Sequence, residues 1–490
     1  MRYADLAVIV FYLIGITWFG ARFKESQKSL KDYFLGGRTT PWWAIAFSIV
    51  SAETSTLTVI GTPALAFNGN LGFLQVVLGY LLARVVISSL LLPHYFRGEM
   101  YTAYELMQRR FGPRIRKFTA GSFLILRALA EGVRVFAISI VISIILQSIL
   151  PGTNEAWSIG LIVCLTLFYT FEGGMTAVIW TDVIQMFLYI GGAILSFFVI
   201  LGKIPGGWSH VVATAEPLGK FAVFDFRFSL STEFFSRTYN FWAGLIGGCF
   251  LTTASHGTEQ LMVQRLLSAR SERESRVALF ASWLVIFFQF SLFLVIGLML
   301  FVYYQDNSIA PPIKPDRIYP EFIWKNLPYG ISGLVIAAIL AAAMSNLAAA
   351  LNSLASTTVM DFYKPIAEAR GRHRSEESWL SFARRSTLFW GAVLFAIALI
   401  AQQVTSVLEA GLGIASVVYG ALLGTFLLGI LTRRVGESAA IAGMAASLAV
   451  MLYVRLGTSI AWTWYVLIGT SVTFLTALCV SYFTPQRTHS

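Results

Sequence analysis

The chain has 490 residues, of which 57% are hydrophobic and only 12% are charged, and its mean hydropathy is +0.70. Long uncharged apolar runs recur from residue 4 to residue 483, so no segment remains that could fold as a sizeable soluble domain. These features exclude a soluble multidomain enzyme. The formal net charge of +11 comes from basic residues in short segments between apolar runs, where membrane orientation explains them, so no nucleic-acid partner is implied.

Windows of about 20 apolar residues, the length that crosses a hydrocarbon core of roughly 30 Å, predict an all-α integral membrane protein. We predict thirteen transmembrane helices, near residues 4–22, 42–66, 71–96, 117–150, 156–172, 176–202, 239–264, 275–304, 330–362, 380–402, 406–431, 436–456 and 461–483. The first helix lacks a basic leading segment and a small-residue cleavage site, so we expect it to be retained and not removed as a signal peptide.

The distribution of Lys and Arg predicts the orientation of the chain in the lipid bilayer. With the N-terminus outside, the inward segments carry 24 of the 36 basic residues, the outward segments carry nine and the spans carry three. Because basic residues favour the cytoplasmic side, we expect a multi-pass protein of the plasma (inner) membrane, with its N-terminus outside and its C-terminus in the cytoplasm.

Two of the predicted spans are interrupted by polar residues at membrane depth. One break runs from Ser51 to Pro63, and the other runs from Gly247 to Gly257. Free backbone groups are tolerated in a bilayer only where protein or a water-filled cavity satisfies them, so such breaks indicate a binding site. The interrupted spans are five helices apart, and a five-helix repeat returns with inverted topology, as in secondary transporters. The alternative is that Gly and Pro are simply common in membrane helices.

Three residues of the ninth span share one helical face: Ala342, Ser345 and Asn346. A carbonyl, a hydroxyl and an amide oxygen on this face can bind a small monovalent cation if an unwound neighbouring helix adds further carbonyl oxygens. The alternative is that the small residues allow close helix packing. The spacing alone does not separate these interpretations.

The fourth span carries Arg127, Glu131 and Arg134 at i, i+4 and i+7, hence on one face. Charges in hydrocarbon cost about 2.5 to 3.5 kcal/mol each on insertion scales, so these side chains should face a cavity or one another. One interpretation is a self-compensating ion cluster that locks the helix bundle. The other is that one arginine receives the carboxylate of a substrate in bidentate geometry.

Other polar residues lie beside the breaks or inside spans. Glu53, His256 and Glu259 flank the breaks, and His256 can bond a substrate hydroxyl, carry a proton or cap a helix end. Asp182 lies inside an apolar span and is expected to be functional. Arg84 lies nearer the inner end of its span, where a long side chain can extend its charge to the membrane surface, so no role is assigned to it.

Several motifs resemble the sodium/solute symporter family, which includes the sodium/glucose cotransporters, proline permease and the sodium/sialic acid transporter. Phe171 to Asp182 resembles the family's GG-x-x-AV-x-WTD signature, and Glu259 to Arg270 resembles its Q-x-x-x-QR-x-L-x-A segment. Ala341 to Ser353, with Asp361 and Tyr363, resembles its AA-x-x-S-S/T run, and Pro41-Trp42-Trp43 with Gly61 resembles the entry to its first core helix. The resemblance covers residues 5 to 365 in the right order.

The resemblance implies a LeuT-type fold that works by alternating access. Its two inverted five-helix repeats would be residues 42–202 and 239–431. A first helix and connector (1–41), an extracellular loop (203–238) and two C-terminal helices with a short tail (432–490) would complete the chain.

A sodium ion, the implied cofactor, would be bound by the carbonyls of Ser51, Thr54 and Ala342 and by the side chains of Ser345 and Asn346. The family usually has Ser or Thr at the last position. Some members bind a second sodium through hydroxyls one turn further on, where this chain has Ala348 and Ala349. The resemblance therefore implies one sodium per cycle, with Asp182 in the cation exit path.

The expected substrate-binding residues lie around the two breaks and on the third and fourth spans. They are Glu53, Thr58, Gln75, Arg127, Glu131, Arg134, Thr252, Ser255, His256 and Glu259. The sugar-binding set of sugar-transporting relatives is not reproduced. We expect a small polar solute: a sugar, a sugar acid or another carboxylate. A polyhydroxylated acid, another carboxylate or a vitamin-like anion would use Arg127 or Arg134.

The sequence thus predicts a sodium-coupled symporter that imports a small polar organic solute, with no obligatory protein partner evident. The alternative is proton coupling on the same fold, through His256, Glu53 or Asp182. A membrane enzyme or a sensor is a distant alternative. No HExxH, GxSxG or Walker motif appears, and no output domain is expected after residue 483.

Overall fold

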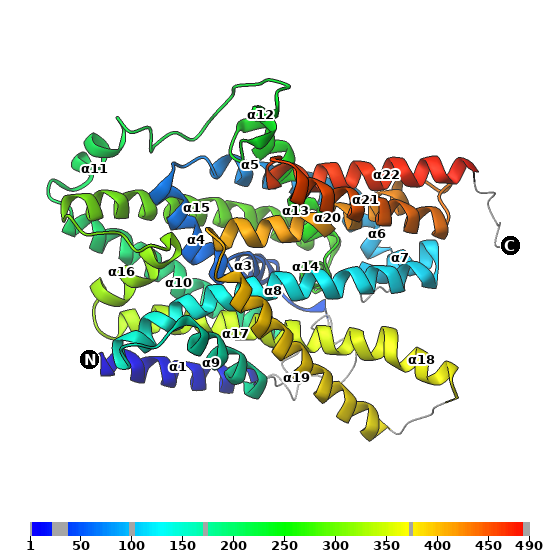
Figure 1. Cartoon of the computed structure of the whole chain (residues 1–490), viewed down its shortest axis with the longest axis horizontal. Coiled ribbons are helices and arrows are strands. Elements are labelled where there is room, and N and C mark those ends of the chain that lie inside the picture. The colour runs from blue at the N-terminus through cyan, green and yellow to red at the C-terminus, as the bar shows by residue number, and fades with distance from the viewer. Residues whose placement is uncertain (1, 22–37, 98–102, 170–174, 372–375, 484–490) are drawn as a thin grey trace.

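The computed structural model describes residues 2–21, 38–97, 103–169, 175–371 and 376–483. These residues are almost entirely helical, and the β pairing recorded among them is one isolated bridge between Thr40 and Ala269. Figure 1 shows that most long helices run along the long axis of the molecule, while α19 (Glu376–Ala401) crosses them obliquely. One end of the bundle carries α11 (Gly207–Ala215) and α16 (Ile318–Asn326), and the other carries α7 (Ala103–Phe111) and α18 (Lys364–Ala369).

Most helices are single continuous segments. They are α1 (Tyr3–Ala21), α5 (Leu74–Val86), α6 (Leu92–Phe96), α8 (Pro113–Ile149), α9 (Glu155–Tyr169), α10 (Met175–Lys203), α12 (Thr232–Ser236), α15 (Glu272–Asp306), α17 (Ile331–Thr357), α20 (Val407–Leu431), α21 (Glu437–Gly457) and α22 (Tyr465–Phe483). Short π-helical or 3₁₀ segments lie at η3 (Ile87–Leu91), η4 (Ala243–Gly247), η5 (Pro315–Arg317), η6 (Thr358–Tyr363) and η7 (Trp462–Trp464).

The described helices are long and apolar enough to cross a membrane, in agreement with the predicted fold class. Within the described ranges, nine helices meet a length and hydropathy test for a span, or ten if one bent pair is counted as a single span. Two shorter apolar helices, Tyr3–Phe19 and Glu155–Leu167, add to these. The all-α membrane architecture is confirmed, whereas the number of thirteen spans stays a prediction.

The first predicted break is present in the structure. The span is divided into α3 (Trp42–Glu53) and α4 (Thr56–Asn68), which meet at an angle of 63°. Thr54 and Ser55 leave the helical conformation between them, with ψ angles of 66° and 170°. The hydroxyl of Thr58 donates to the carbonyl of Glu53 at 3.0 Å, so a side chain satisfies part of the freed backbone.

The second predicted break is also present, but it lies just beyond the polar run that predicted it. The π-helical η4 leads into α13 (Gly248–Gly257), and α14 (Gln260–Leu267) follows after two residues. Thr258 and Glu259 interrupt the helix, and Glu259 has extended backbone angles. Gly247 and Gly248 serve close packing, because a Cβ on Gly248 would lie 2.4 Å from the carbonyl oxygen of Val76 on α5.

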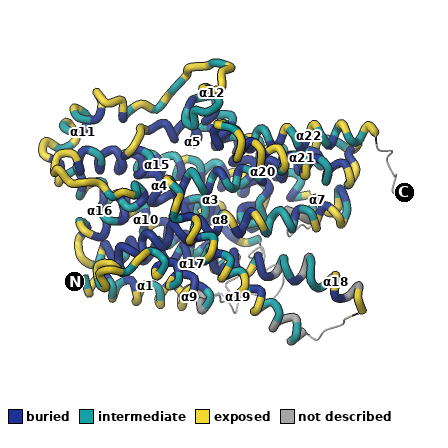
Figure 2. Tube along the Cα trace, in the orientation of Figure 1, coloured by how far each residue is buried: buried dark blue, intermediate teal, exposed yellow. Residues whose placement is uncertain are grey.

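The expected loop of residues 203–238 contains the short helices α11 and α12. Figure 2 shows that the segment leading to α12 is largely exposed. The ammonium group of Lys220 donates to the carbonyls of Phe67 and Gly69 at 2.7 and 3.1 Å, which ties the loop to the end of α4. The loop is therefore anchored to the first broken span.

Candidate functional site

A cavity of about 150 Å³, here called the central cavity, lies between the two broken spans, α5, α8 and α20. Its lining includes eight of the ten predicted substrate-binding residues: Glu53, Thr58, Arg127, Arg134, Thr252, Ser255, His256 and Glu259. Much of the remaining wall is apolar and includes Leu57, Phe73, Leu251, Phe290, Leu408 and Leu412. A cavity with a few charged groups on one side and an apolar wall on the other suits a small amphipathic ligand.

The charged face of α8 forms the ion cluster that its spacing predicted. Glu131 is almost fully buried, and its Oε1 lies 3.1 Å from a guanidinium nitrogen of Arg127 and accepts from Arg134 at 2.7 Å. The two arginines differ in exposure, because 29% of the Arg134 side chain is accessible against 9% for Arg127. Glu131 thus lies behind two arginines that both line the central cavity, and it offsets the desolvation of both.

Glu259, at the second break, connects three elements. Its Oε1 accepts from Arg127 of α8 at 3.0 Å, and its Oε2 accepts from the hydroxyl of Tyr419 on α20 at 2.5 Å. Because Glu259 has extended backbone between α13 and α14, its side chain can reach both neighbours. Arg127 is therefore held by two carboxylates, Glu131 and Glu259.

Glu53, at the first break, forms a second cluster with residues of α5 and α13. Its Oε2 lies 3.3 Å from Arg84 and 3.1 Å from Nε2 of His256, and Nδ1 of His256 lies 2.9 Å from the hydroxyl of Ser255. The interpretation that Arg84 extends to the membrane surface is wrong, because its side chain is completely buried. A carboxylate partner inside the bundle makes burial of this arginine cheaper than a bare charge in hydrocarbon.

The charges of these clusters balance. Among the described residues of the two clusters, Arg84, Arg127 and Arg134 face Glu53, Glu131 and Glu259. With His256 neutral, the site carries no net charge of its own.

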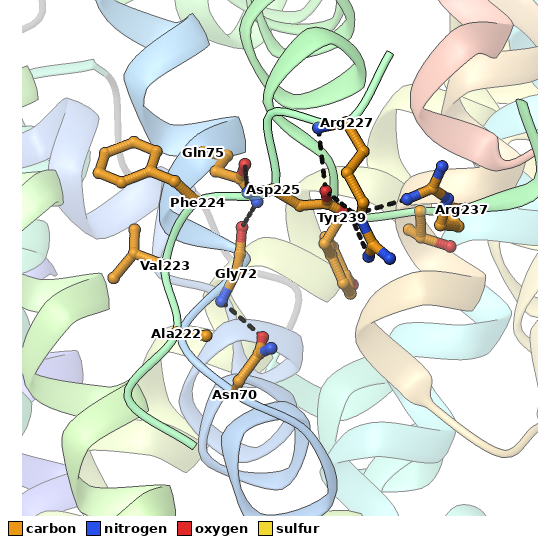
Figure 3. A pocket seen from close by; sticks show the side chains of 11 residues that line it. Asn70, Gly72, Gln75, Ala222, Val223, Phe224, Asp225, Arg227, Arg237 and Tyr239 are labelled. Carbon is orange, nitrogen blue, oxygen red and sulfur yellow. Dashed lines mark hydrogen bonds and ion pairs between the residues drawn. The ribbon is translucent and has the colours of Figure 1, made fainter. Parts of the chain in front are cut away.

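Gln75 lies at a different pocket, here called the loop pocket, which has a volume of about 560 Å³ (Figure 3). Its Oε1 accepts from the backbone N–H of Asp225 at 3.0 Å, so it holds the loop of residues 203–238 against α5. Arg227 and Arg237 both contact the carboxylate of Asp225, at 2.8 and 2.9 Å. The hydrogen bond from Arg227 lowers the pKa of Asp225 to about 2, which keeps this carboxylate ionised.

The predicted sodium ligands include backbone oxygens that the first break leaves free. Within the described residues, neither the carbonyl of Ser51 nor that of Thr54 accepts a hydrogen bond. On α17, the side chains of Ser345 and Asn346 are half-buried, and no hydrogen bond is recorded for either of them in the described part of the chain. Carbonyl, hydroxyl and amide oxygens are the uncharged ligands that small alkali ions bind.

Asp182 of α10 is buried and ion-paired. Its Oδ2 accepts from Arg265 of α14 at 2.9 Å and from the hydroxyl of Ser48 on α3 at 2.7 Å, and Arg265 also donates to Ser48 at 2.9 Å. The three residues join α3, α10 and α14. Part of the surrounding signature, Phe171 to Gly174, lies outside the described residues.

Sequence reasoning missed several partners of these groups: Ser48, Arg84, Arg265, Gln289 and Tyr419. Gln289 of α15 donates to the hydroxyl of Thr54 at 2.5 Å. A signal existed for Arg84, since a charge inside a predicted span is by itself a functional candidate. Arg265 lies in the Glu259 to Arg270 segment, but nothing in the sequence indicates a role for it. Nothing local marks Tyr419, because its partner Glu259 is 160 residues away.

Comparison with known proteins agrees with this architecture. The model of the sodium:solute symporter family matches residues 33–447. The sodium/sialic acid symporter of Proteus mirabilis is 30% identical over 94% of this chain and 90% of that protein. The human sodium/iodide cotransporter is 28% identical over 94% of this chain and 70% of its own, and a bovine sodium-coupled monocarboxylate transporter is 28% identical over 94% and 73%.

A solved structure, the substrate-bound outward-open state of a Na⁺-coupled sialic acid symporter, matches with a TM-score of 0.80. It is 28% identical in sequence, and the match covers 98% of both chains. The LeuT-type fold implied by the motifs is therefore confirmed, and sodium coupling is favoured over the proton-coupled alternative. The chain belongs to the sodium:solute symporter family, and it is a multi-pass membrane protein that couples solute import to sodium and is not an enzyme.

Proposed function

We propose that the solute is a small monocarboxylate with an apolar body, and that Arg134 binds its carboxylate. The observation that carries this proposal is the difference between the two arginines of α8. Arg127 is held by two carboxylates, whereas in the described structure Arg134 contacts Glu131 and keeps 29% of its side chain accessible at the central cavity. An arginine that retains unused donors in a cavity is suited to bidentate binding of a carboxylate.

The remainder of the cavity supports an apolar body in preference to a polyhydroxylated one. Of the 25 residues that line the cavity, 14 are apolar, glycine included, and nine of these are leucine or phenylalanine. The volume of about 150 Å³ is smaller than the roughly 300 Å³ at which typical ligand pockets begin, so it suits a short acid better than a bulky sugar acid. The relatives compared above are named for sialic acid, iodide and monocarboxylate, which are all anions at neutral pH.

One sodium ion would accompany the solute, bound by the carbonyls of Ser51, Thr54 and Ala342 and the side chains of Ser345 and Asn346. The free carbonyls at the first break support this assignment. A second site has weaker support, because Ala348 and Ala349 offer no hydroxyl and Asp182 is already paired with Arg265. We keep Asp182 at the exit path of the cation, where release of sodium would accompany loosening of its contacts with α3 and α14.

The two five-helix repeats would alternate access to the central cavity, with the N-terminus outside and the C-terminus in the cytoplasm of the plasma membrane. The positive-inside pattern then makes the end with α7 and α18 the cytoplasmic one. The ion would join the first broken span to α17 and so favour the state that completes the solute site, which makes the two binding events reciprocal.

The test is thermal unfolding of the purified protein with acetate, propionate, pyruvate, benzoate, their amides, glucose and galactose, each in sodium and in potassium buffer. A ligand that binds only the native state raises the midpoint in proportion to its occupancy. We expect a carboxylate, and not its amide, to stabilise the protein in sodium buffer only. Equal stabilisation by the amides, or by glucose and galactose, would remove Arg134 as the anion site.

Variants of Arg134 sharpen this test. Arg134→Gln should raise the Kd for the carboxylate at least tenfold. Arg134→Lys should retain part of the affinity, because it keeps the positive charge but loses the bidentate geometry of the guanidinium group. Arg276→Gln is the matched control, since Arg276 forms an exposed pair with Glu272 on α15. It should leave the Kd unchanged.

A further inference from the structure

The central cavity shares a wall with a larger cavity of about 590 Å³, here called the second cavity. The second cavity reaches α7 and α17, and its lining includes Gln108, Arg116, Thr119, Gln264 and Ser353. Three side chains line both cavities: Phe123, Arg127 and Glu259. These three form the barrier between the two spaces, and in the proposed orientation the second cavity is the cytoplasmic one.

The barrier is held by an ion pair and not by packing alone. Arg127 contacts Glu259 at 3.0 Å, and the hydroxyl of Tyr419 donates to the second oxygen of the same carboxylate at 2.5 Å. The barrier thus joins α8, the second break and α20. Only 9% of Arg127 and 16% of Glu259 are exposed, so both charges are compensated inside the protein: Glu259 by Arg127, and Arg127 by Glu259 together with Glu131.

The barrier also continues the row of charges on which the solute would be bound. Arg134, Glu131 and Arg127 follow one face of α8, and Arg127 lies seven residues, about 10 Å, nearer to the second cavity. Glu131 contacts both arginines through the same oxygen. A carboxylate that leaves Arg134 toward the second cavity therefore meets Arg127 next.

We propose that Arg127 is a second, exit-side carboxylate site, at which the solute displaces Glu259 and thereby opens the barrier. This proposal rests on the proposed function, because it requires an anionic solute on Arg134. Glu259 and the solute present the same chemical group to the guanidinium, so exchange of one carboxylate for the other never leaves Arg127 buried without a counter-charge. Opening without a solute would leave Arg127 and Arg134 to share the single carboxylate of Glu131, which keeps the barrier closed in the absence of solute.

The exchange also selects the solutes that are transported. A neutral molecule of the same shape can occupy the apolar part of the central cavity, but it has no group to replace Glu259 on Arg127. It would bind without being released to the second cavity. Anion selectivity would then be stronger for transport than for binding.

The test separates binding from transport in reconstituted vesicles, with benzoate and propionate as probes. The variant Arg127→Gln/Glu259→Gln removes both charges of the barrier pair and leaves the net charge unchanged, so it is expected to fold. Its Kd, measured by stabilisation in sodium, should stay within threefold of the wild type, while its uptake rate should fall at least tenfold. Arg276→Gln changes an exposed charge on α15 that lines neither cavity, and it should leave both quantities within twofold.

A second measurement reports the barrier directly. Ala415 lines the central cavity, so the variant Ala415→Cys, with Cys164, Cys249 and Cys479 replaced by Ser, reports access to that cavity. In inverted vesicles, Glu259→Gln should speed the reaction of the introduced thiol with a charged thiol reagent at least fivefold, because an amide competes poorly for Arg127.

Each outcome has a definite meaning. If the double variant takes up either acid at the wild-type rate, or if its uptake falls only as far as its binding, Arg127 is not an exit site. Unchanged labelling of the introduced thiol in the Glu259→Gln background would equally overturn the barrier role. If neither acid binds the wild-type protein while another class of solute does, the proposed function has failed, and the exit site fails with it.

Discussion

At each helix break, a glutamate forms an ion pair with an arginine of a neighbouring helix, yet the two ion pairs lie in different surroundings. At the first break, Glu53 contacts Arg84 at 3.3 Å, and at the second, Glu259 contacts Arg127 at 3.0 Å. Arg84 has no exposed side-chain surface, whereas Arg127 and Glu259 have a cavity on either side. The chemistry of an ion pair therefore does not decide its role, because what matters is whether another group can reach it.

A pair whose arginine is fully buried, so that no ligand can replace the carboxylate on it, acts as a structural connection. Glu53 and Arg84 join the broken first span to α5, and His256 extends this connection to α13 at 3.1 Å. A pair between two cavities can exchange its partner for a ligand. This difference leads to predictions that separate the two breaks, beginning with the largest expected effect.

Arg84→Met should cause the largest loss of stability. It leaves the carboxylate of Glu53 buried beside His256 without its arginine, and removing one partner of a buried pair typically costs about 3 to 5 kcal/mol. Thermal unfolding and the monodisperse yield after size exclusion measure this effect. Adding Glu53→Gln should recover much of the loss, and the absence of any recovery would show that packing of Arg84, not charge, is responsible.

Asp316 should make stability depend on pH at the start of α20, the helix that carries Tyr419. It is buried and accepts from the backbone N–H of Val407 at 3.1 Å. Burial raises its pKa from 3.8 to about 6, so the folded state favours the protonated form. This contribution is fully present below about pH 4 and is lost as pH rises through 6, at a cost of up to roughly 3 kcal/mol.

Asp316→Asn should remove the loss of stability at high pH, while its amide oxygen still accepts from the backbone N–H of Val407. Its unfolding midpoint should therefore exceed that of the wild type at pH 7.5 and equal it near pH 4. A wild-type midpoint that is constant between pH 4 and pH 7 would contradict the assignment.

Ser345→Ala should weaken sodium binding without lowering the stability of the folded protein. Removing one oxygen ligand is expected to raise the sodium concentration for half-maximal uptake about tenfold, equivalent to about 1.4 kcal/mol. The matched control is Ser353→Ala on the same helix, which should leave the sodium dependence unchanged. If both variants behave alike, α17 contributes no side-chain ligand from Ser345.

The smallest expected effect concerns the electrical current during uptake, which should be absent. In the proposed function, a monovalent carboxylate and one sodium ion cross a site in which three arginines balance three glutamates. Uptake into vesicles should therefore proceed without net charge movement and should be insensitive to an imposed voltage. A sodium-dependent inward current during carboxylate uptake would indicate more than one sodium per cycle.

The sequence predicted the features that depend on local pattern. The length of the apolar runs indicated the membrane helices. Polar residues at membrane depth indicated both breaks, because hydrocarbon does not tolerate unpaired polar groups. The spacing of Arg127, Glu131 and Arg134 placed them on one face, as the structure confirms. Most of the expected substrate-binding residues follow from these two local rules.

The sequence did not predict the partners that tertiary packing brings together. Arg84 was assigned no role because its partner Glu53 is 31 residues away and on another helix. Gln75 was expected at the solute, but the loop that it holds reaches it from 150 residues further on. The exact position of the second break depends on Thr258 and Glu259, and the side chain of Glu259 is stabilised by contacts with α8 and α20.

The charge balance of the site has a consequence for the cell. If one sodium ion enters with each carboxylate, membrane voltage does no work on the cycle, and the sodium concentration ratio alone sets the largest accumulation of solute. A roughly tenfold sodium gradient would support about tenfold accumulation, about 1.4 kcal/mol. Such a carrier would continue to work in a depolarised cell. It would reverse as soon as the ratio of internal to external acid exceeded the ratio of external to internal sodium.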